Sequence, residues 1–362
     1  MILQTYRVSI EAEGADARPA WDDLVAQSSD VALSKTPQWA DCVCSSDHFS
    51  DATLLLRGED GRRVIFPRLR NPTIPGLFSS PPRHWNLGAD ASGFLSEGSP
   101  VSLSEAGALV QEIRRHSGLR TRIVVGQDDA RVWAAAVPSR VYSIARTAQV
   151  LDLRGDFSTV WSKRFTSKVR SNSRKAERRG VVVESDSTGR LMPVFDVLYR
   201  SSVDRWAQER GYPLTLMRWL AKRQHPQDKF AKVARTLGEI CTVWIAWRQG
   251  EPIAGIINLT KGSRVTYWRG AMDKERARGT GANELLHRCA IEVACGDGRH
   301  SYDFGLSQTV DLQRFKGTFG TSEVPVHIYY FEKFPTAAAE IKYYEAAKQT
   351  IRAAMRLGRT GG

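Results

Sequence analysis

The chain has 362 residues, which is long enough for two domains that each bury a sizeable core. The chain has 52 Lys and Arg residues against 39 Asp and Glu, so its formal charge is +13. This positive charge indicates either an anionic partner or simply a basic surface. No apolar run approaches ~18 residues and the start lacks the basic and apolar regions of a signal peptide, which predicts neither a membrane span nor a cleaved leader.

The cysteines predict a reducing compartment. They stand at positions 42, 44, 241, 289 and 295, form no CxxC pair and are odd in number. An odd, scattered set argues against a disulfide framework. We therefore expect a cytoplasmic protein.

The first 148 residues are predicted to form one α/β unit. Residues 52–70 contain two β-rich runs joined by the turn GEDG, which predicts a β-hairpin. A helix at 104–117 and a strand at 120–126 are predicted to follow. The run 244–259 repeats the plan of strand, arginine, short turn and strand. This faint duplication predicts two tandem α/β units, at 1–148 and 149–335, each with a mixed, mostly antiparallel sheet flanked by helices. Residues 336–362 are predicted to be a helix that docks back, with a flexible tail.

A strongly basic helix is predicted over residues 159–179. Trp161, Phe165, Val169, Asn172 and Ala176 recur at steps of three or four and define one face. The rest of the segment carries cations, and Glu177 alone opposes them. Those proposed to bind an anion are Lys163, Arg164, Lys168, Arg170, Arg174, Lys175 and Arg178. Phosphate groups would relieve their mutual repulsion, whereas the ordinary alternative is a solvated helix face.

A meander, a glycine loop and a helix follow one another between residues 241 and 294. The β-rich runs 241–247, 253–259 and 265–270 are separated by turns, and a helix is predicted from Ala282. Gly279 and Gly281 precede that helix, whose first N–H groups and dipole favour an anion. The segment therefore predicts either a phosphate cradle or a simple turn into a helix. It is not the dinucleotide fingerprint, which follows a parallel strand.

The segment 302–320, YDFGLSQTVDLQRFKGTFG, places a lysine among aromatic residues. Lys316 lies between Phe315 and Phe319, so its ammonium is held beside apolar surface. That environment suits either an anionic ligand or a structural ion pair. A closing strand is predicted over residues 324–334.

These segments resemble a known superfamily. Arg276, Gly279 and Gly281 satisfy the Q/R-x-x-G-x-G/A donor-phosphate pattern of the GNAT acyltransferases. Residues 164–184 and 302–320 look like the corresponding parts of the FemAB/FemX group of tandem-GNAT transferases. The resemblance implies an acyltransferase that forms an amide bond.

The resemblance also implies roles for individual residues. Donor binding would fall to Arg276, Arg278, Gly279, Gly281, Arg314 and Phe315, and Lys316 would face the developing oxyanion. Acceptor binding would fall to Arg205 or Arg210, with Trp206 and Tyr267. No coiled-coil arm is predicted between residues 211 and 240, which is similar to the armless FemX type.

Amide formation requires the acceptor amine to lose a proton. For an amine of pKa near 10.4, this loss costs roughly 4.6 kcal/mol at pH 7. Asp303 and Asp273 are the candidate proton acceptors, and the substrate's own phosphate or carboxylate is the alternative. The sequence shows no defensible Ser-His-Asp arrangement and no metal-ligand spacing, so no metal is expected.

Two donors fit the glycine loop, because aminoacyl-tRNA and acyl-CoA both end in a phosphorylated adenosine. The charge favours aminoacyl-tRNA, and the intact phosphate pattern favours acyl-CoA. Either would be a co-substrate rather than a tightly bound cofactor. The acceptor is predicted to be an amine on a small metabolite or a peptidoglycan precursor. The non-enzymatic alternative is a basic RNA-binding protein, and the sequence does not predict an oligomeric state.

Overall fold

The computed structural model of the chain describes residues 6–47, 49–71, 78–79, 85–91, 93–226, 228–307, 309–340, 342–343 and 346. Their packing defines two compact units. The first draws on residues 1–168, 259–268 and 291–333, and the second on residues 169–258, 269–290 and 334–362. Mixed sheets flanked by helices confirm the predicted α/β class. The division of the sequence near residue 148 stays a prediction, because these units reflect packing rather than duplication.

The first unit begins with a small sheet in the order β1-β3-β4-β7. The hairpin predicted at 52–70 is confirmed as β3 pairing antiparallel with β4. Leu54, Leu56, Val64 and Phe66 project from it into a core that also receives α3. The bounds are Val8–Glu13 for β1, Leu54–Gly58 for β3, Arg63–Phe66 for β4, Leu95–Ser96 for β7 and Leu103–Arg115 for α3.

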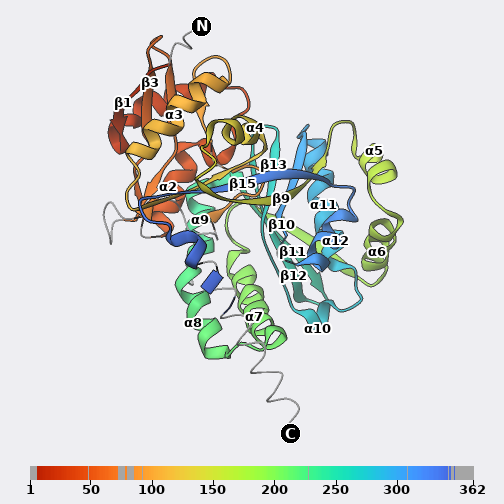
Figure 1. Cartoon of the computed structure of the whole chain (residues 1–362). Helices are drawn as coiled ribbons and strands as arrows, with labels where there is room; N and C mark the ends of the chain where they lie inside the picture. The colour runs from red at the N-terminus through yellow and green to blue at the C-terminus, as the bar shows by residue number, and fades with distance from the viewer. Residues whose placement is uncertain are drawn as a thin grey trace. The chain divides into compact units, whose positions relative to one another are not determined.

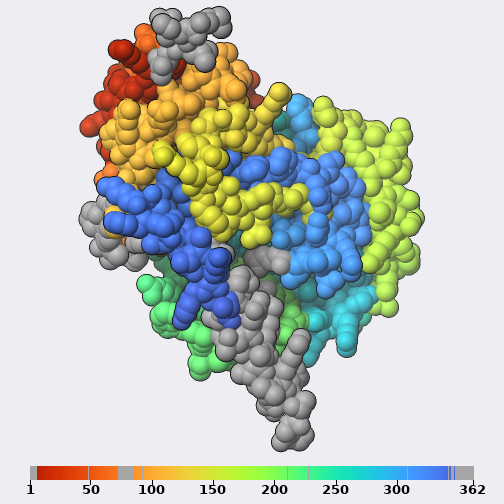
Figure 2. Space-filling view, viewed as in Figure 1, coloured from red at the N-terminus to blue at the C-terminus, as the bar shows by residue number. Residues whose placement is uncertain are grey.

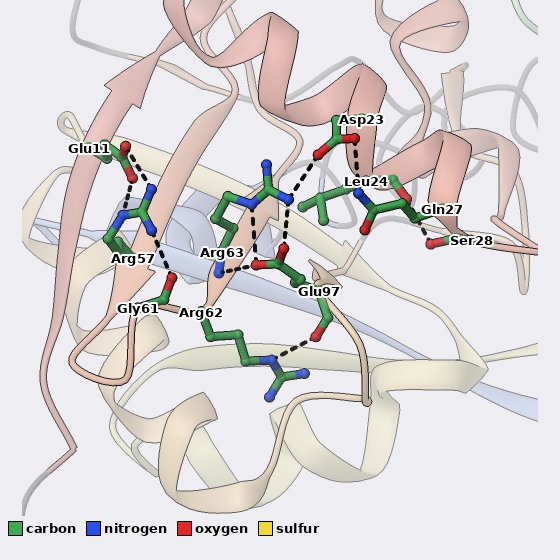
Figure 3. Close-up of polar contacts among 10 residues, drawn as sticks. All are labelled: Glu11, Asp23, Leu24, Gln27, Ser28, Arg57, Gly61, Arg62, Arg63 and Glu97. Carbon is green, nitrogen blue, oxygen red and sulfur yellow. Dashed lines mark hydrogen bonds and ion pairs between the residues drawn. The ribbon is translucent and has the colours of Figure 1, made fainter.

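Ion pairs tie the exposed side of this small sheet together (Figure 3). Arg57 on β3 contacts Glu11 on β1, with Nε 2.6 Å from Oε2. Arg63 on β4 contacts both Glu97 and Asp23, at 2.6 and 2.8 Å. In these pairs the positive charge of each arginine is balanced by a neighbouring carboxylate. Part of the high arginine content therefore stabilises the fold rather than making the surface more positive.

The rest of the first unit is built around long antiparallel strands. β15 pairs with β9 on one side and with β8 on the other, and β9 also pairs with β14. The strands are β2 Ser50–Asp51, β5 Leu69–Arg70, β6 Phe78–Ser79, β8 Arg120–Val125, β9 Tyr142–Asp152, β14 Ser301–Leu306 and β15 Ser322–Glu332. The helices are α1 Arg18–Gln27, α2 Pro37–Ser46, α4 Gln127–Ala136, α5 Phe157–Thr159 and α12 Val310–Gly317.

The predicted meander is present in the large sheet, although residues 259–268, which include the end of β12 and the start of β13, belong to the first unit. β10, β11, β12 and β13 are neighbours in that order, and β10 pairs antiparallel with β11. The strands are β10 Val181–Asp186, β11 Cys241–Arg248, β12 Glu251–Lys261 and β13 Arg264–Met272. The helices are α6 Ser167–Arg178, α7 Met192–Arg210, α8 Leu214–Gln224, α9 Lys229–Leu237, α10 Lys274–Ala277 and α11 Ala282–Gly296 (Figure 1). The helix predicted after the glycine loop is therefore confirmed as α11.

The continuous helix predicted over residues 159–179 is wrong. The segment folds as the end of α5, a π-helical stretch at Val160–Arg164 and then α6. Phe165 is extended, with ψ 133°, and the N–H of Thr166 bonds the carbonyl of Thr318 at 3.0 Å. This hydrogen bond to a residue far along the chain takes the place of the hydrogen bond that Thr166 would make in a continuous helix. The helix therefore breaks here in spite of the helical spacing of its apolar residues. Phe165, Val169 and Ala176 are nevertheless buried, as their spacing predicts.

The helix predicted over residues 336–362 falls mostly outside the described residues, which include only 336–340, 342–343 and 346 of it. Across the helices that the structure does describe, none combines the length and apolar character needed to cross a bilayer.

Candidate functional site

A left-handed turn precedes α11. Gly279 and Gly281 have φ of 64° and 84°, a region that residues with a side chain rarely adopt. Between them, the hydroxyl of Thr280 donates to the carbonyl of Ala277 at 2.7 Å and accepts from the N–H of Ala282 at 3.2 Å. α11 starts at Ala282, so its remaining first-turn N–H groups have no carbonyl partner within the helix.

The basic helix α6 packs directly on this turn. A side chain at Gly281 would lie closer than 3.0 Å to the carbonyl oxygen of Asn172. The amide of Asn172 donates to Glu284 Oε1 at 2.7 Å, and Arg179 Nη1 donates to the carbonyl of Gly279 at 2.7 Å. The two segments that the sequence singled out separately thus form one surface of the second unit.

A cleft of about 420 Å³ opens at this junction, within the range of small-molecule sites. Its cations are Lys175 from α6, Lys274 from α10 and Arg278 from the turn. Lys274 is already paired with Glu209 at 2.5 Å. The complete lining is Asn172, Lys175, Met272, Lys274, Ala277, Arg278, Gly279, Gly281, Ala282, Asn283 and Glu284. Cations beside a helix N-terminus suit the phosphates of a nucleotide-bearing ligand.

Arg276 and Asp273, both predicted as site residues, hold the loop together. Asp273 caps α10 through Oδ1, which accepts the N–H groups of Glu275 and Arg276 at 3.1 Å each. The guanidinium of Arg276 lies 2.7 Å from Glu251 and 3.6 Å from Asp273. Neither residue is among those that line the cleft, whereas Arg278, Gly279 and Gly281 are.

The predicted acceptor residues fall in different surroundings. Arg205 Nη1 donates to the carbonyl of Met272 at 2.8 Å and its guanidinium lies 5.7 Å from the ring centroid of Trp206. Burial lowers the pKa of Arg205. Tyr267 belongs to the first unit, where its ring is 6.4 Å from that of Phe304. The side chain of Arg210 lies outside the described part of the structure.

The predicted cationic patch divides into exposed and engaged members. Lys163, Lys168, Arg174 and Arg178 are exposed, and Arg170 and Lys175 are half-buried. Arg164 contacts Asp152 at 3.5 Å and donates to the carbonyl of Arg154 at 2.8 Å. Arg164 is thus engaged within the protein, whereas Lys163, Lys168 and Arg178 are exposed.

Lys316 is buried in the first unit, with 2% of its side chain exposed. It lies on α12, and its Nζ donates to the carbonyls of Gly305 and Leu306 at 3.0 and 2.8 Å. Burial lowers the pKa of Lys316 to about 8, partly offset by the negative charge of Asp303. Phe315 packs on Phe319 at 5.4 Å between ring centroids, and Arg314 is exposed beside Asp311.

Asp303 contacts the same stretch of backbone, the bend at Gly305, whose carbonyl accepts from Lys316. Its Oδ1 accepts the N–H of Gly305 and its Oδ2 that of Ala89, both at 2.6 Å. Burial raises the pKa of Asp303 to about 6, against the opposing effect of these bonds and of Lys316. Gly305 has φ 68°, so the two ionisable groups clamp a bend that only glycine adopts easily.

Asp90 is a neighbour of this pair that the sequence did not reveal. Its Oδ2 accepts the N–H of Leu33 at 3.1 Å, and Arg264 lies 3.4 Å from Oδ1. Burial raises the pKa of Asp90 to about 7. Because its partners are 57 and 174 residues away along the chain, no local pattern could have indicated it.

Comparison with known proteins agrees with this geometry. Residues 163–317 match the family model described as the acetyltransferase (GNAT) domain. Over most of its length, the fold of the chain is similar to that of FemX, with 14% identity, a TM-score of 0.59 and 87% of this chain aligned to 96% of FemX. A C-terminal domain from Agrobacterium fabrum, of a protein named as a lysylphosphatidylglycerol synthetase, aligns with 12% identity, a TM-score of 0.52 and coverage of 91% and 95%. A search of curated proteins finds no match.

The segment that matches the GNAT domain model contains the glycine turn, the residues that line the cleft and Lys316. The particular architecture is FemX-like, since the similarity to that fold covers most of the chain.

Proposed function

We propose that this enzyme transfers an aminoacyl group from aminoacyl-tRNA to an amine, forming an amide. The observation that carries the proposal is the cationic cleft at the start of α11, bordered by the basic helix α6. The terminal adenosine and phosphates of the donor would bind at Gly279, Gly281 and Arg278, and the exposed cations of α6 would contact the tRNA backbone.

Lys316 is the proposed catalytic residue. A lysine ammonium has three N–H donors, and the carbonyls of Gly305 and Leu306 use two of them. The third would meet the oxyanion that develops on the donor carbonyl. Phe315 and Arg314 would seat the donor. Asp303, whose pKa of about 6 lies close to neutrality, would accept the proton of the attacking amine, directly or through water.

Acyl-CoA is the second candidate donor. A cradle for phosphates beside a terminal adenosine fits CoA as well, and GNAT-type acetyltransferase similarity over residues 163–317 supports it. The four exposed cations Lys163, Lys168, Arg174 and Arg178 favour the larger anion, because they extend along a basic segment rather than converge on one phosphate group.

Donor discrimination tests the proposal. The protein is incubated separately with labelled aminoacyl-tRNAs and with acyl-CoAs, and a mixture of small amines and peptidoglycan precursors is then added. We expect label to leave the tRNA and appear in an amide. Loss of label from acyl-CoA alone would establish the second donor, and turnover of neither donor would favour the basic RNA-binding protein.

Lys316→Ala tests the catalytic role. The variant should slow transfer at least ~100-fold, the scale for the loss of an oxyanion contact. The exposed Lys333→Ala is the matched control, and thermal unfolding checks that Lys316→Ala is folded at the assay temperature. Near-wild-type turnover by folded Lys316→Ala would refute the role.

A further inference from the structure

α8 presents an outward face that the described residues of the second unit leave exposed. All eleven residues of this helix are described, and none of them is buried. Leu216 and Trp219 are 44% and 55% exposed. With Arg223 they follow the spacing i, i+3, i+7, so the three side chains share one face.

The orientation of this face is fixed by α7. Arg218 on α8 contacts Asp204 on α7 through two bonds of 2.8 and 2.7 Å. α8 lies beside α7 in Figure 1. Because this pair holds the helix by its other side, Leu216 and Trp219 point away from α7 rather than toward a core.

The charge of the face is positive. The helix sequence LTLMRWLAKRQ contains no acid, and its cations at or beside this face are Arg223 and Lys222, since Arg218 lies on the other side and is paired with Asp204. The guanidinium of Arg223 lies 5.5 Å from the ring centroid of Trp219, which joins a cation to the apolar surface. Lys222 is exposed on the adjoining side.

We propose that the outward face of α8 binds the surface of an anionic lipid bilayer. Leu216 and Trp219 would lose exposed apolar surface in an apolar phase, which neither a soluble anion nor a nucleic acid supplies for a leucine. Trp at the headgroup level with Lys or Arg beside it is the composition of an interfacial helix. The cations match anionic headgroups, and each contributes roughly a fivefold increase in affinity near such a surface.

Vesicle binding tests this proposal. Because the assay contains neither donor nor acceptor, its result does not depend on the transferase activity. The full chain is mixed with vesicles of phosphatidylcholine alone, or with one third phosphatidylglycerol, and bound protein is separated by flotation. We expect binding to the anionic vesicles that weakens as salt rises. Lys222→Gln with Arg223→Gln should weaken it about 25-fold. Leu216→Ala with Trp219→Ala should lose most of the remaining binding.

A charge-matched control separates a specific face from the overall charge of +13. Arg131→Gln with Arg140→Gln removes two exposed arginines of the first unit. Equal weakening by this control would overturn the proposal, as would failure of the wild-type chain to bind anionic vesicles. Brominated lipids should quench fluorescence in the wild type more than in Trp219→Phe. Equal quenching, or loss of tRNA binding rather than vesicle binding in Trp219→Ala, would also contradict it.

Discussion

At the scale of single residues, the sequence could identify Lys316 and Asp303 as candidates but not their surroundings. The resemblance of residues 302–320 to FemX-like proteins pointed to Lys316, and the end of a predicted strand pointed to Asp303. The carbonyls that Lys316 contacts belong to a bend at Gly305 and Leu306, and the second bond to Asp303 comes from Ala89. These contacts depend on tertiary packing, for which no local signal exists.

Burial of Lys316 predicts a dependence of stability on alkaline pH. The folded pKa is about 8 and the unfolded value is 10.5, so between these values the unfolded chain binds more protons. Stability contributed by this group therefore rises with pH across that window. Relative to Lys316→Met, the free energy of unfolding of the wild type should gain about 3 kcal/mol between pH 8 and 10.5. Urea unfolding of both proteins measures the difference, and a gap that stays constant with pH would contradict the burial of the charge.

At the scale of elements, strongly patterned segments were predictable and weakly patterned ones were not. The β-rich runs between turn residues correctly predicted the strands β11, β12 and β13 and the hairpin β3–β4, and the segment after the glycine loop correctly predicted the helix α11. The break at Phe165 could not be foreseen, because it depends on a bond between Thr166 and Thr318. α8 was missed because none of its residues enters the core, so it lacks a buried stripe.

The glycine turn permits a matched comparison within one element. Gly281→Ala places a methyl group against the backbone of Asn172, which cannot easily move, at φ 84°. Gly279→Ala has φ 64° and meets only the end of Arg179, at 3.6 Å. Each left-handed alanine costs roughly 1–2 kcal/mol. Gly281→Ala should be destabilised by that amount plus the cost of moving α11 away from α6, and should bind donor more weakly.

Urea unfolding and donor binding measure both variants. Gly279→Ala should keep its α6–α11 contact, including the bond from Asn172 to Glu284. Equal losses of stability in the two variants would mean that the close approach of Gly281 to Asn172 does not hold the turn.

At the scale of the whole molecule, composition and the order of elements were enough to predict the α/β class, but not how each unit is assembled, and the anionic partner stays a prediction. Each unit gathers segments from distant parts of the chain, as when residues 259–268 pack with residues 1–168. Such assembly depends on contacts between residues that are far apart in the sequence. These contacts produce no periodic pattern from which the sequence could predict them. Figure 2 shows another such contact, in which the yellow residues of β9 lie beside the blue residues of β15. Many of the described arginines are engaged in ion pairs, such as those of Arg57 and Arg63.

The exposed cations of α6 predict how donor binding responds to salt. Each phosphate contact made by a cation adds about −0.7 to −0.9 to the slope of log K against log salt. Lys168 and Arg178 are exposed on α6, so replacing both by Gln should make the slope for aminoacyl-tRNA shallower by roughly 1.4–1.8. Arg131→Gln with Arg140→Gln, which removes the same charge elsewhere, should leave the slope unchanged. Filter binding at several salt concentrations measures all three proteins. If wild-type slope is near zero, or if both double variants change it equally, net charge rather than α6 governs the interaction and tRNA is not the specific donor.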